Sequence, residues 1–443
     1  MTIQTNDTIC AIATPPGRGG IGVIRISGPE AHAIALQLTH QSLPARTARF
    51  ITVFDGQDQS IDHGLALSFP SPHSFTGEDV VELQLHGSPI LLEQALLAAV
   101  QAGARRAGPG EFSQRAFLND KIDLAQAEAI ADLIAATSEQ AARAAQRSLQ
   151  GAFSERVHSL ADAITRLRVW VEAALDFPDE DIDFLADGKV LQSVEDLIEQ
   201  TEHLLEQAEA GRLLNDGIRI AIIGKPNAGK SSLFNALAQR DSAIVTDVPG
   251  TTRDVLRETV HFAGIPAVLA DTAGLRNTDD VVELEGVRRA QAELKLADLV
   301  LWVVDASAAP DEQEQPPAVS APVIRVNNKL DQLNHPLDTA PDQVYVSAIT
   351  GQGLDQLDAA IVRVLGLTAE FQGEFSARAR HVEQIKTSLD HLTQGRTQLA
   401  DFSSGELLAE ELSLAATALG EITGQLHSDE LLGMIFSSFC IGK

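Results

Sequence analysis

The stretch Gly224-Lys225-Pro226-Asn227-Ala228-Gly229-Lys230-Ser231 decides the fold of the central part of this chain. It matches the phosphate-loop pattern G-x-x-x-x-G-K-[ST] without a mismatch. The apolar run 218–223 before it predicts a buried strand, and residues 232–238 after it predict the first turns of a helix, which a chance glycine-rich turn would lack. Such a loop surrounds a phosphate with backbone N–H groups, while Lys230 reaches the terminal phosphates and the Ser231 hydroxyl binds Mg²⁺.

A second motif, at the end of another predicted strand, indicates guanine as the base. Asn328-Lys329-Leu330-Asp331 follows the apolar run 323–326, and the Asp331 carboxylate can accept hydrogen bonds from guanine N1–H and the exocyclic amine. Adenine has no such donor pair and would leave a buried carboxylate unpaired, which is costly. Ser347-Ala348 ends a further strand, where a backbone N–H can meet guanine O6.

A third motif, Asp271-Thr272-Ala273-Gly274, lies between the phosphate loop and the base motif. It follows the apolar run 267–270, so Asp271 can hold Mg²⁺ through water and the Gly274 N–H can meet the γ-phosphate. These motifs, in this order and spacing, predict a GTPase of the Ras-like α/β type.

The position after the third motif departs from the usual pattern. It holds Leu275, where Ras-like proteins commonly have a glutamine that orients the attacking water. Either hydrolysis is poor, or other residues supply the function. The Asn227 carbonyl can help to hold a monovalent cation that stabilises transition-state charge, although an asparagine can equally cap the loop. Glu283, in an acidic stretch, can orient water, although a solvated carboxylate is the simpler interpretation.

Composition is typical of a globular protein of two to four domains. The chain has 443 residues, 44% of them apolar, and no apolar run reaches the ~18 residues of a membrane helix. Its two cysteines, Cys10 and Cys440, are too few for a disulfide framework, and we recognise no secretory signal. We therefore expect a cytoplasmic protein without membrane contact. The net charge of −29, most of it after residue 119, argues against broad nucleic-acid binding, so any RNA contact should be local and shared with a more basic partner.

Sequence periodicity predicts a multidomain fold. Residues 1–119 alternate short β-like runs with glycine and proline turns, and contain one clear helix. Residues 120–216 and 369–443 are rich in Ala, Leu, Glu and Gln, with apolar residues at helical spacing. The GTPase segment, 217–368, lies between them, and such insertions are tolerated because domain termini often lie close together. We expect an N-terminal α+β domain, a helical domain, and a Ras-like α/β GTPase domain inserted into the helical one.

Further motifs give the chain a specific resemblance to a known family. They are Asp7-Thr8-Ile9 with Thr14-Pro15-Pro16-Gly17-Arg18-Gly19-Gly20, Ser74-Phe75-Thr76-Gly77-Glu78-Asp79 followed by Glu82, Arg115-Ala116-Phe117-Leu118-Asn119-Asp120-Lys121 leading into Asp123-Leu124-Ala125-Gln126-Ala127-Glu128, Phe439-Cys440-Ile441-Gly442-Lys443, and the switch segment Val248-Pro249-Gly250-Thr251-Thr252-Arg253-Asp254. In combination they resemble the MnmE (TrmE) family of tRNA modification GTPases over essentially the full length.

The resemblance implies an activity and its partners. The N-terminal domain would bind a tetrahydrofolate derivative, 5-formyl- or methylene-tetrahydrofolate, and would form a homodimer. GTP hydrolysis would be stimulated by K⁺ and coupled to pairing of two GTPase domains. With MnmG, a partner that uses FAD and NADH, the family adds an aminomethyl or carboxymethylaminomethyl group to carbon 5 of the wobble uridine of certain tRNAs. FAD is thus expected on the partner and not on this chain.

The resemblance also assigns site residues by motif position. Folate would contact Arg25, Glu82, Lys121 and Lys443, and Cys440 would serve the chemistry. K⁺ would be held by Asn227, Thr246, Val248 and Thr251, and Mg²⁺ by Ser231 and Thr252, while Glu283 would orient water. The residues predicted to bind GTP are Asn227, Ala228, Gly229, Lys230, Ser231, Ser232, Thr246, Asp247, Val248, Pro249, Gly250, Thr251, Thr252, Asp271, Thr272, Ala273, Gly274, Asn328, Lys329, Asp331, Ser347 and Ala348. Taken singly, Arg25 or Glu82 would be an ordinary strand residue, and Cys440 a buried inert thiol.

Two functions remain open at the level of the sequence. One is a GTPase whose cycle gates tRNA modification, and the other is a GTP-switched RNA or ribosome assembly factor that binds RNA without modifying it. Leu275 fits both, whereas the folate-type N-terminal domain and Cys440 favour the first.

Overall fold

The structure is a computed structural model that describes residues 7–176, 188–240, 257–262, 265–271, 294, 297–308, 319, 321–333, 343–365, 374–402, 404–425, 429–437, 439 and 441–442. The chain divides into two compact units. The first comprises Met1–Ala131, Ser148–Ile198 and Thr387–Lys443, and the second comprises Asp132–Arg147 and Glu199–Lys386. The domain boundaries predicted after residues 119, 216 and 368 were placed from sequence patterns, whereas this division into units reflects spatial contacts. The predicted boundaries therefore stay predictions.

The N-terminal part of the first unit is a six-stranded sheet in the order β3-β4-β5-β2-β1-β6. Neighbouring strands are antiparallel, except that β1 and β6 are parallel. The strands are β1 (Ile9–Ile12), β2 (Gly19–Ser27), β3 (Arg49–Phe54), β4 (Ser60–Phe69), β5 (Val80–Gly87) and β6 (Arg105–Arg106).

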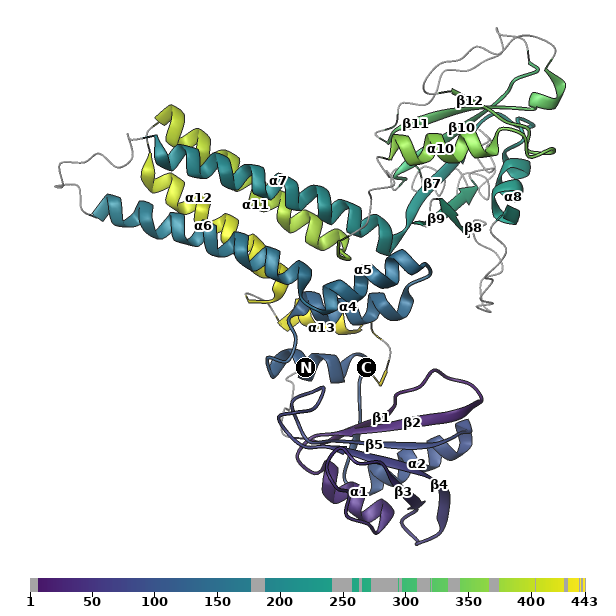
Figure 1. Cartoon of the computed structure of the whole chain (residues 1–443), viewed down its shortest axis with the longest axis vertical. Helices are drawn as coiled ribbons and strands as arrows, with labels where there is room; N and C mark the ends of the chain where they lie inside the picture. Colours follow the sequence, from purple (N-terminus) through teal and green to yellow (C-terminus); the bar gives the residue numbers. More distant parts are fainter. Residues whose placement is uncertain are drawn as a thin grey trace, which may run out of the picture. The chain divides into compact units, whose positions relative to one another are not determined.

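The two faces of this sheet are covered differently. Helices α1 (Ala31–Thr39) and α2 (Pro89–Gln101) lie on one face, where they bury Ile24, Ile26 and Leu83 (Figure 1). Because side chains alternate along a strand, Arg25 and Glu82 point to the other face. There α3 (Glu111–Leu118) covers the end near β1, and its Phe112 packs against Ile9 and Ala11.

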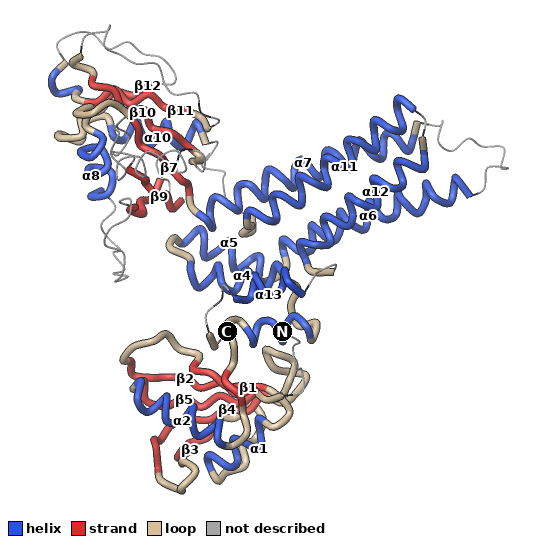
Figure 2. The backbone as a smooth tube through the Cα atoms, turned by 180° about the vertical axis from the view of Figure 1, so that it is seen from behind, coloured by secondary structure: helices blue, strands red, loops and turns tan. Residues whose placement is uncertain are grey.

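Long helices complete the first unit. Helix α6 (Ala152–Asp176) runs alongside α12 (Gly405–Thr423), as both views show (Figure 2). The Ser404 hydroxyl caps the start of α12, and Gly424 ends it in the left-handed conformation. Helix α13 (Asp429–Ser437) then packs on α3, with Phe436 beside Phe117. Four further helices have residues in both units: α4 (Leu124–Ala135), α5 (Glu139–Leu149), α7 (Lys189–Asp216) and α11 (Ala379–Phe402).

The second unit contains a six-stranded sheet in the order β12-β11-β10-β7-β9-β8. Only β8 runs antiparallel to its neighbour, and the other pairs are parallel. The elements are β7 (Ile218–Ile223), α8 (Lys230–Arg240), β8 (Arg257–Phe262), β9 (Ile265–Asp271), β10 (Leu299–Asp305), β11 (Val323–Asn328), the short 3₁₀ helix η2 (Leu330–Gln332), β12 (Gln343–Tyr345) and α10 (Leu354–Val364). The central strand β10 is apolar and buried along its first six residues, as expected of a parallel strand covered on both faces.

The predicted fold class is confirmed: an α+β part, a helical part, and a mostly parallel α/β sheet inserted between helical segments. Helix α7 leads directly into β7, and the Arg212 guanidinium donates to the Asp298 carboxylate 3.0 Å away, just before β10. Among the helices of the described residues, none has the length and apolar character needed to cross a lipid bilayer.

Candidate functional site

The phosphate loop lies between β7 and α8, and close backbone contacts fix its shape. Gly224 has φ 150°, and a Cβ there would lie 2.2 Å from the Val303 carbonyl oxygen. Gly229 has φ 93°, and its Cβ would lie 2.1 Å from Asn328 Nδ2. Only glycine fits at these two positions. Asn227 has φ 65°, a left-handed conformation that asparagine tolerates better than most residues. This backbone conformation can by itself explain why an asparagine occupies the position, whether or not its side chain binds a cation.

Asn328 joins the phosphate loop to the base motif. Its side chain is 2% exposed; Nδ2 donates to the Ala228 carbonyl at 3.0 Å, and Oδ1 accepts from the Ala348 N–H at 3.1 Å. Close by, the Ser347 hydroxyl donates to Asp331 Oδ1 at 2.6 Å. The phosphate loop and two later segments, 100 and 120 residues further along the chain, therefore meet at the carboxyl ends of parallel strands, the usual place for a ligand in such a sheet.

The two lysines of the motifs are held by neighbouring acceptors. Lys230 Nζ donates to the carbonyls of Gly224 and Lys225, at 2.8 and 2.9 Å. Lys329 forms an ion pair with Asp305 at the end of β10. Burial raises the pKa of the Asp305 carboxyl, but hydrogen bonds from Lys329 and Ser307 outweigh it and hold the pKa below its ordinary value. Asp305 thus stays ionised and keeps Lys329 beside the loop.

Several predicted site residues lie outside the described part of the chain. They are Thr246, Asp247, Val248, Pro249, Gly250, Thr251, Thr252, Thr272, Ala273, Gly274, Glu283, Cys440 and Lys443. For Asp271 the backbone is described: it ends β9 and pairs in register with Ile222, two residues before Gly224. Ser231 and Ser232 are exposed in the first turn of α8.

A second group of predicted residues lies at the face of the N-terminal sheet opposite α1 and α2. Arg25 and Glu82 are cross-strand partners, with Nε and Nη2 of Arg25 at 2.9 and 2.8 Å from Glu82 Oε1. The guanidinium carbon lies 5.8 and 5.6 Å from the ring centres of Phe75 and Phe112, within the range of cation–π attraction. Arg25 Nη1 also donates to the Gly442 carbonyl at 3.4 Å, so the C-terminal tail reaches this arginine.

Lys121 is held against the loop of residues 71–79, which connects β4 to β5. Its Nζ donates to the Pro72 carbonyl at 3.1 Å. Its aliphatic stem packs on Gly77, where a Cβ would lie 3.3 Å from Lys121 Cγ and Cδ. The same loop carries Phe75, which faces Arg25, so the loop connects two of the predicted folate contacts.

Comparison with known proteins identifies the family. A model described as "MnmE helical domain" matches residues 124–440, and one described as "GTP-binding protein TrmE N-terminus" matches residues 8–121. Relatives named tRNA modification GTPase MnmE from Marinobacter nauticus and Saccharophagus degradans are 52% and 50% identical, over 99% and 100% of this chain and the same shares of their own lengths. The chain belongs to the MnmE family of tRNA modification GTPases.

Membership of the MnmE family confirms the expected resemblance and the assignment as a GTP-binding, GTP-hydrolysing enzyme. Among solved structures, the G domain of the T. maritima FeoB iron transporter is 24% identical, over 33% of this chain and 98% of its own, with a TM-score of 0.24. That score is too low to add to what the strand order shows.

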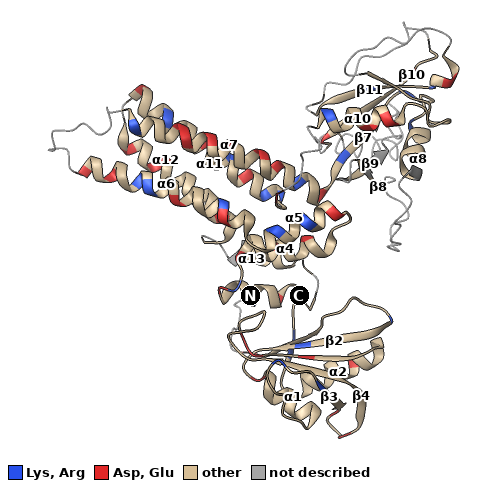
Figure 3. Cartoon of the chain, viewed as in Figure 1, with Lys and Arg blue, Asp and Glu red and all other residues tan. Residues whose placement is uncertain are grey.

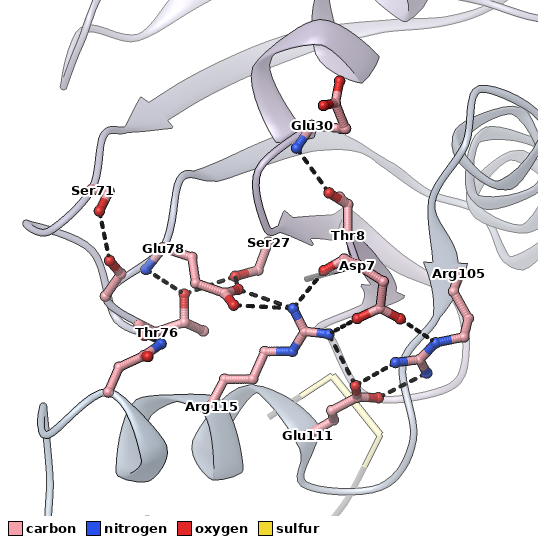
Figure 4. Close-up of polar contacts among 12 residues, drawn as sticks. Asp7, Thr8, Ser27, Glu30, Ser71, Thr76, Glu78, Arg105, Glu111 and Arg115 are labelled. Carbon is pink, nitrogen blue, oxygen red and sulfur yellow. Dashed lines mark hydrogen bonds and ion pairs between the residues drawn. The ribbon is translucent and has the colours of Figure 1, made fainter. Parts of the chain in front are cut away.

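The sequence did not reveal an ion-pair network that surrounds the buried Arg115 and joins three of the MnmE-family motifs (Figure 4). Arg115, on α3, is 1% exposed, and its guanidinium donates to Asp7, Glu78 and Glu111 at 2.6 to 3.2 Å. Arg105 binds two of the same carboxylates, those of Asp7 and Glu111, at 2.6 to 3.1 Å. Each motif could be read from the sequence, but no residue pattern indicated that these charges pair with one another around a buried arginine.

The arginines favour the ionised forms of the Asp7 and Glu111 carboxyls, whose pKa values they lower. Burial raises the pKa values of the Asp7 and Glu111 carboxyls, but hydrogen bonds from Arg105 and, for Asp7, Arg115 outweigh burial and hold both pKa values below their ordinary range. The Gly108 N–H adds a further bond to Glu111 at 2.7 Å. A charge-assisted network of this kind fixes the backbone segments that carry its members.

Proposed function

We propose that this chain hydrolyses GTP to gate modification of the wobble uridine of certain tRNAs. With an MnmG-type partner that carries FAD, it would add an aminomethyl or carboxymethylaminomethyl group at carbon 5, using a one-carbon unit from tetrahydrofolate. The observation that carries the nucleotide part is the pair of hydrogen bonds made by Asn328, which hold a phosphate loop and a guanine motif together. Full-length likeness to the MnmE relatives supports the tRNA part.

In this proposal nucleotide binding exchanges partners within the loop. Lys230 leaves the carbonyls of Gly224 and Lys225 for the terminal phosphates, and the N-terminus of α8 adds positive potential. Asp331 recognises the guanine edge while the Ala348 N–H meets O6. Ser231 and Thr252 would hold Mg²⁺. Two hydroxyl oxygens suit this ion, because Mg²⁺ prefers oxygen ligands and usually binds only a few protein oxygens in addition to phosphate and water.

Hydrolysis would depend on K⁺ and on pairing of two GTPase domains. Leu275 cannot orient water, so we assign that role to Glu283. A K⁺ ion held by Asn227, Thr246, Val248 and Thr251 would supply positive charge where other GTPases use an arginine. The exposed position of Asn227 at the loop surface supports this assignment.

Folate would bind at the Arg25–Glu82 pair. One Glu82 oxygen takes both bonds from Arg25, and the other has no bond from the described residues, so it can accept from pterin N–H groups. Phe75 offers a partly exposed ring, and Lys121 and Lys443 would provide charge for the glutamate tail. Cys440, two positions before Gly442 in the sequence, would serve the modification chemistry.

A homodimer through the N-terminal domain fits an exposed apolar row on the sheet face that α1 and α2 leave open. Phe50, Leu65, Gln84 and Val23 are successive cross-strand partners there, and Phe50 and Leu65 are 70% and 40% exposed. In Figure 3 basic residues are scattered among acidic ones along the long helices. Because this chain has a net charge of −29, it would contact tRNA only locally, and MnmG would share the binding.

The wobble-uridine content of tRNA from a deletion strain tests the proposal against the assembly-factor alternative. We expect the modified uridine to be lost, and to return with the wild-type gene but not with Lys230→Ala. Normal modification combined with defective ribosome assembly would instead support the assembly factor.

A further inference from the structure

Of the motif Ser74-Phe75-Thr76-Gly77-Glu78-Asp79, only Phe75 and Gly77 lie against the proposed folate contacts. Thr76 and Glu78 of the same motif form short hydrogen bonds to neighbouring segments. The motif belongs to the loop of residues 71–79. Phe75 of this loop faces Arg25, and Gly77 supports the stem of Lys121. The loop therefore touches both of these folate candidates with its side chains and backbone.

Buried hydrogen bonds anchor the loop in its middle. Thr76 is fully buried, and its hydroxyl lies 2.7 Å from the Ser27 hydroxyl on β2. Asn119, two residues before Lys121, donates its Nδ2 to the Thr76 carbonyl at 2.7 Å. The loop is thus fastened to β2, which carries Arg25, and to the segment that carries Lys121.

Glu78 connects this loop to the ion-pair network. Its Oε2 accepts from the Ser27 hydroxyl at 2.6 Å, and its two oxygens lie 3.1 and 3.2 Å from Arg115 Nη1 (Figure 4). The network holds two guanidinium groups and three carboxylates, so Asp7 and Glu111 would still balance Arg105 and Arg115 without the Glu78 charge. The charge of Glu78 is therefore not needed to neutralise the buried arginine, and its effect falls on the loop.

We infer that Glu78 is a positioning residue for folate binding: its bond to Arg115 sets the loop of residues 71–79, and so places Phe75 and Lys121 around Arg25. The inference rests on the proposed folate site. If it is correct, the ion-pair network affects ligand affinity. A purely structural network would affect only the stability of the fold.

The test compares Glu78→Gln with a matched control, Glu93→Gln, whose carboxylate pairs with Arg106 at the surface of the same domain. The full-length variants are titrated with 5-formyl-tetrahydrofolate by calorimetry, and their amide hydrogen exchange is measured. For Glu78→Gln we expect folate affinity to fall about tenfold, the effect of roughly one charged hydrogen bond, with GTP affinity and Tm unchanged. Exchange should accelerate in residues 71–79 and stay normal in α1 and α2, and Glu93→Gln should match the parent in every measurement.

Parental affinity in Glu78→Gln, or faster exchange across the whole sheet with a matching fall in Tm, would overturn the inference. If Glu78→Gln does not fold, Phe75→Leu replaces it, because Phe75 is partly exposed and touches Arg25; unchanged affinity there would also contradict the inference. If the parent itself does not bind the probe, the folate proposal fails. The exchange data then decide whether Glu78 sets the loop, since local acceleration supports this and its absence refutes it.

Discussion

The nucleotide site and the Arg25–Glu82 site differ in what holds their residues in place. At the nucleotide site, short segments end neighbouring parallel strands, and close approaches at Gly224 and Gly229, together with hydrogen bonds of the Asn328 side chain, bring them together. At the Arg25 site, side chains from β2, β5, α3 and a loop converge with a backbone carbonyl of the C-terminal tail, and the ion-pair network around the buried Arg115 holds the loop. Strand ends and glycine-dependent backbone geometry therefore build much of the first site, with Asn328 joining its parts, and side-chain electrostatics build much of the second.

The largest expected effect concerns the cation at the backbone-built site. GTP hydrolysis should be about 10²- to 10³-fold faster in K⁺ than in Na⁺ at matched ionic strength, the usual effect of one group that stabilises transition-state charge. Asn227→Ala should remove the advantage while GTP still binds. Equal rates in the two salts would show that the loop and its neighbours need no such cation.

The base pocket gives the next effect. Asp331→Asn should weaken GTP binding about 100-fold, because two hydrogen bonds to guanine are lost and an amide donor faces its N–H groups. Affinity for xanthosine triphosphate should rise in the same variant, which makes that nucleotide the internal control. Parental GTP affinity, measured by equilibrium titration, would mean that the base does not bind beside Ser347 and Asp331.

The same difference explains what could be predicted from the sequence. The phosphate loop, the base motif and the inserted α/β sheet followed from local patterns, because backbone geometry leaves a signature in glycine spacing and apolar runs. Arg25 and Glu82 were named through family resemblance alone. The burial of Arg115 left no signature, because a charged residue in a short motif is usually exposed and its partners lie up to 108 residues away. The tail contact with Arg25 spans 417 residues, beyond any local pattern.

The network should show its electrostatic nature in its dependence on pH. Glu111→Gln should destabilise the N-terminal domain by about 1.5–3 kcal/mol at pH 7, because an amide replaces a carboxylate bound by two arginines. The folded pKa of Glu111 is depressed, so its contribution is fully present above the unfolded pKa of about 4.3 and is lost as the pH falls through the folded pKa. Thermal unfolding from pH 7 to 3 should therefore show the parent and the variant converging below about pH 4. A constant difference across that range would assign the effect to shape rather than charge.

The smallest expected effect is that the Cys10 thiol does not react with an alkylating reagent in the native protein. Cys10 is fully buried, and burial raises the pKa of its thiol to about 11, so iodoacetamide at pH 8 should leave it unlabelled in the native protein. Mass spectrometry should place any native label on Cys440 and find Cys10 labelled only after unfolding. Labelling of Cys10 in the native protein would show that β1 opens readily.

We expect one chain to carry two separately built sites, and paired titrations can confirm or refute this in a single experiment. GTP and 5-formyl-tetrahydrofolate are each titrated by calorimetry into the parent, Lys230→Ala and Arg25→Gln. We expect Lys230→Ala to lose GTP binding and keep folate binding, and Arg25→Gln to show the reverse. Loss of both ligands in either variant, or parental folate affinity in Arg25→Gln, would contradict the claim.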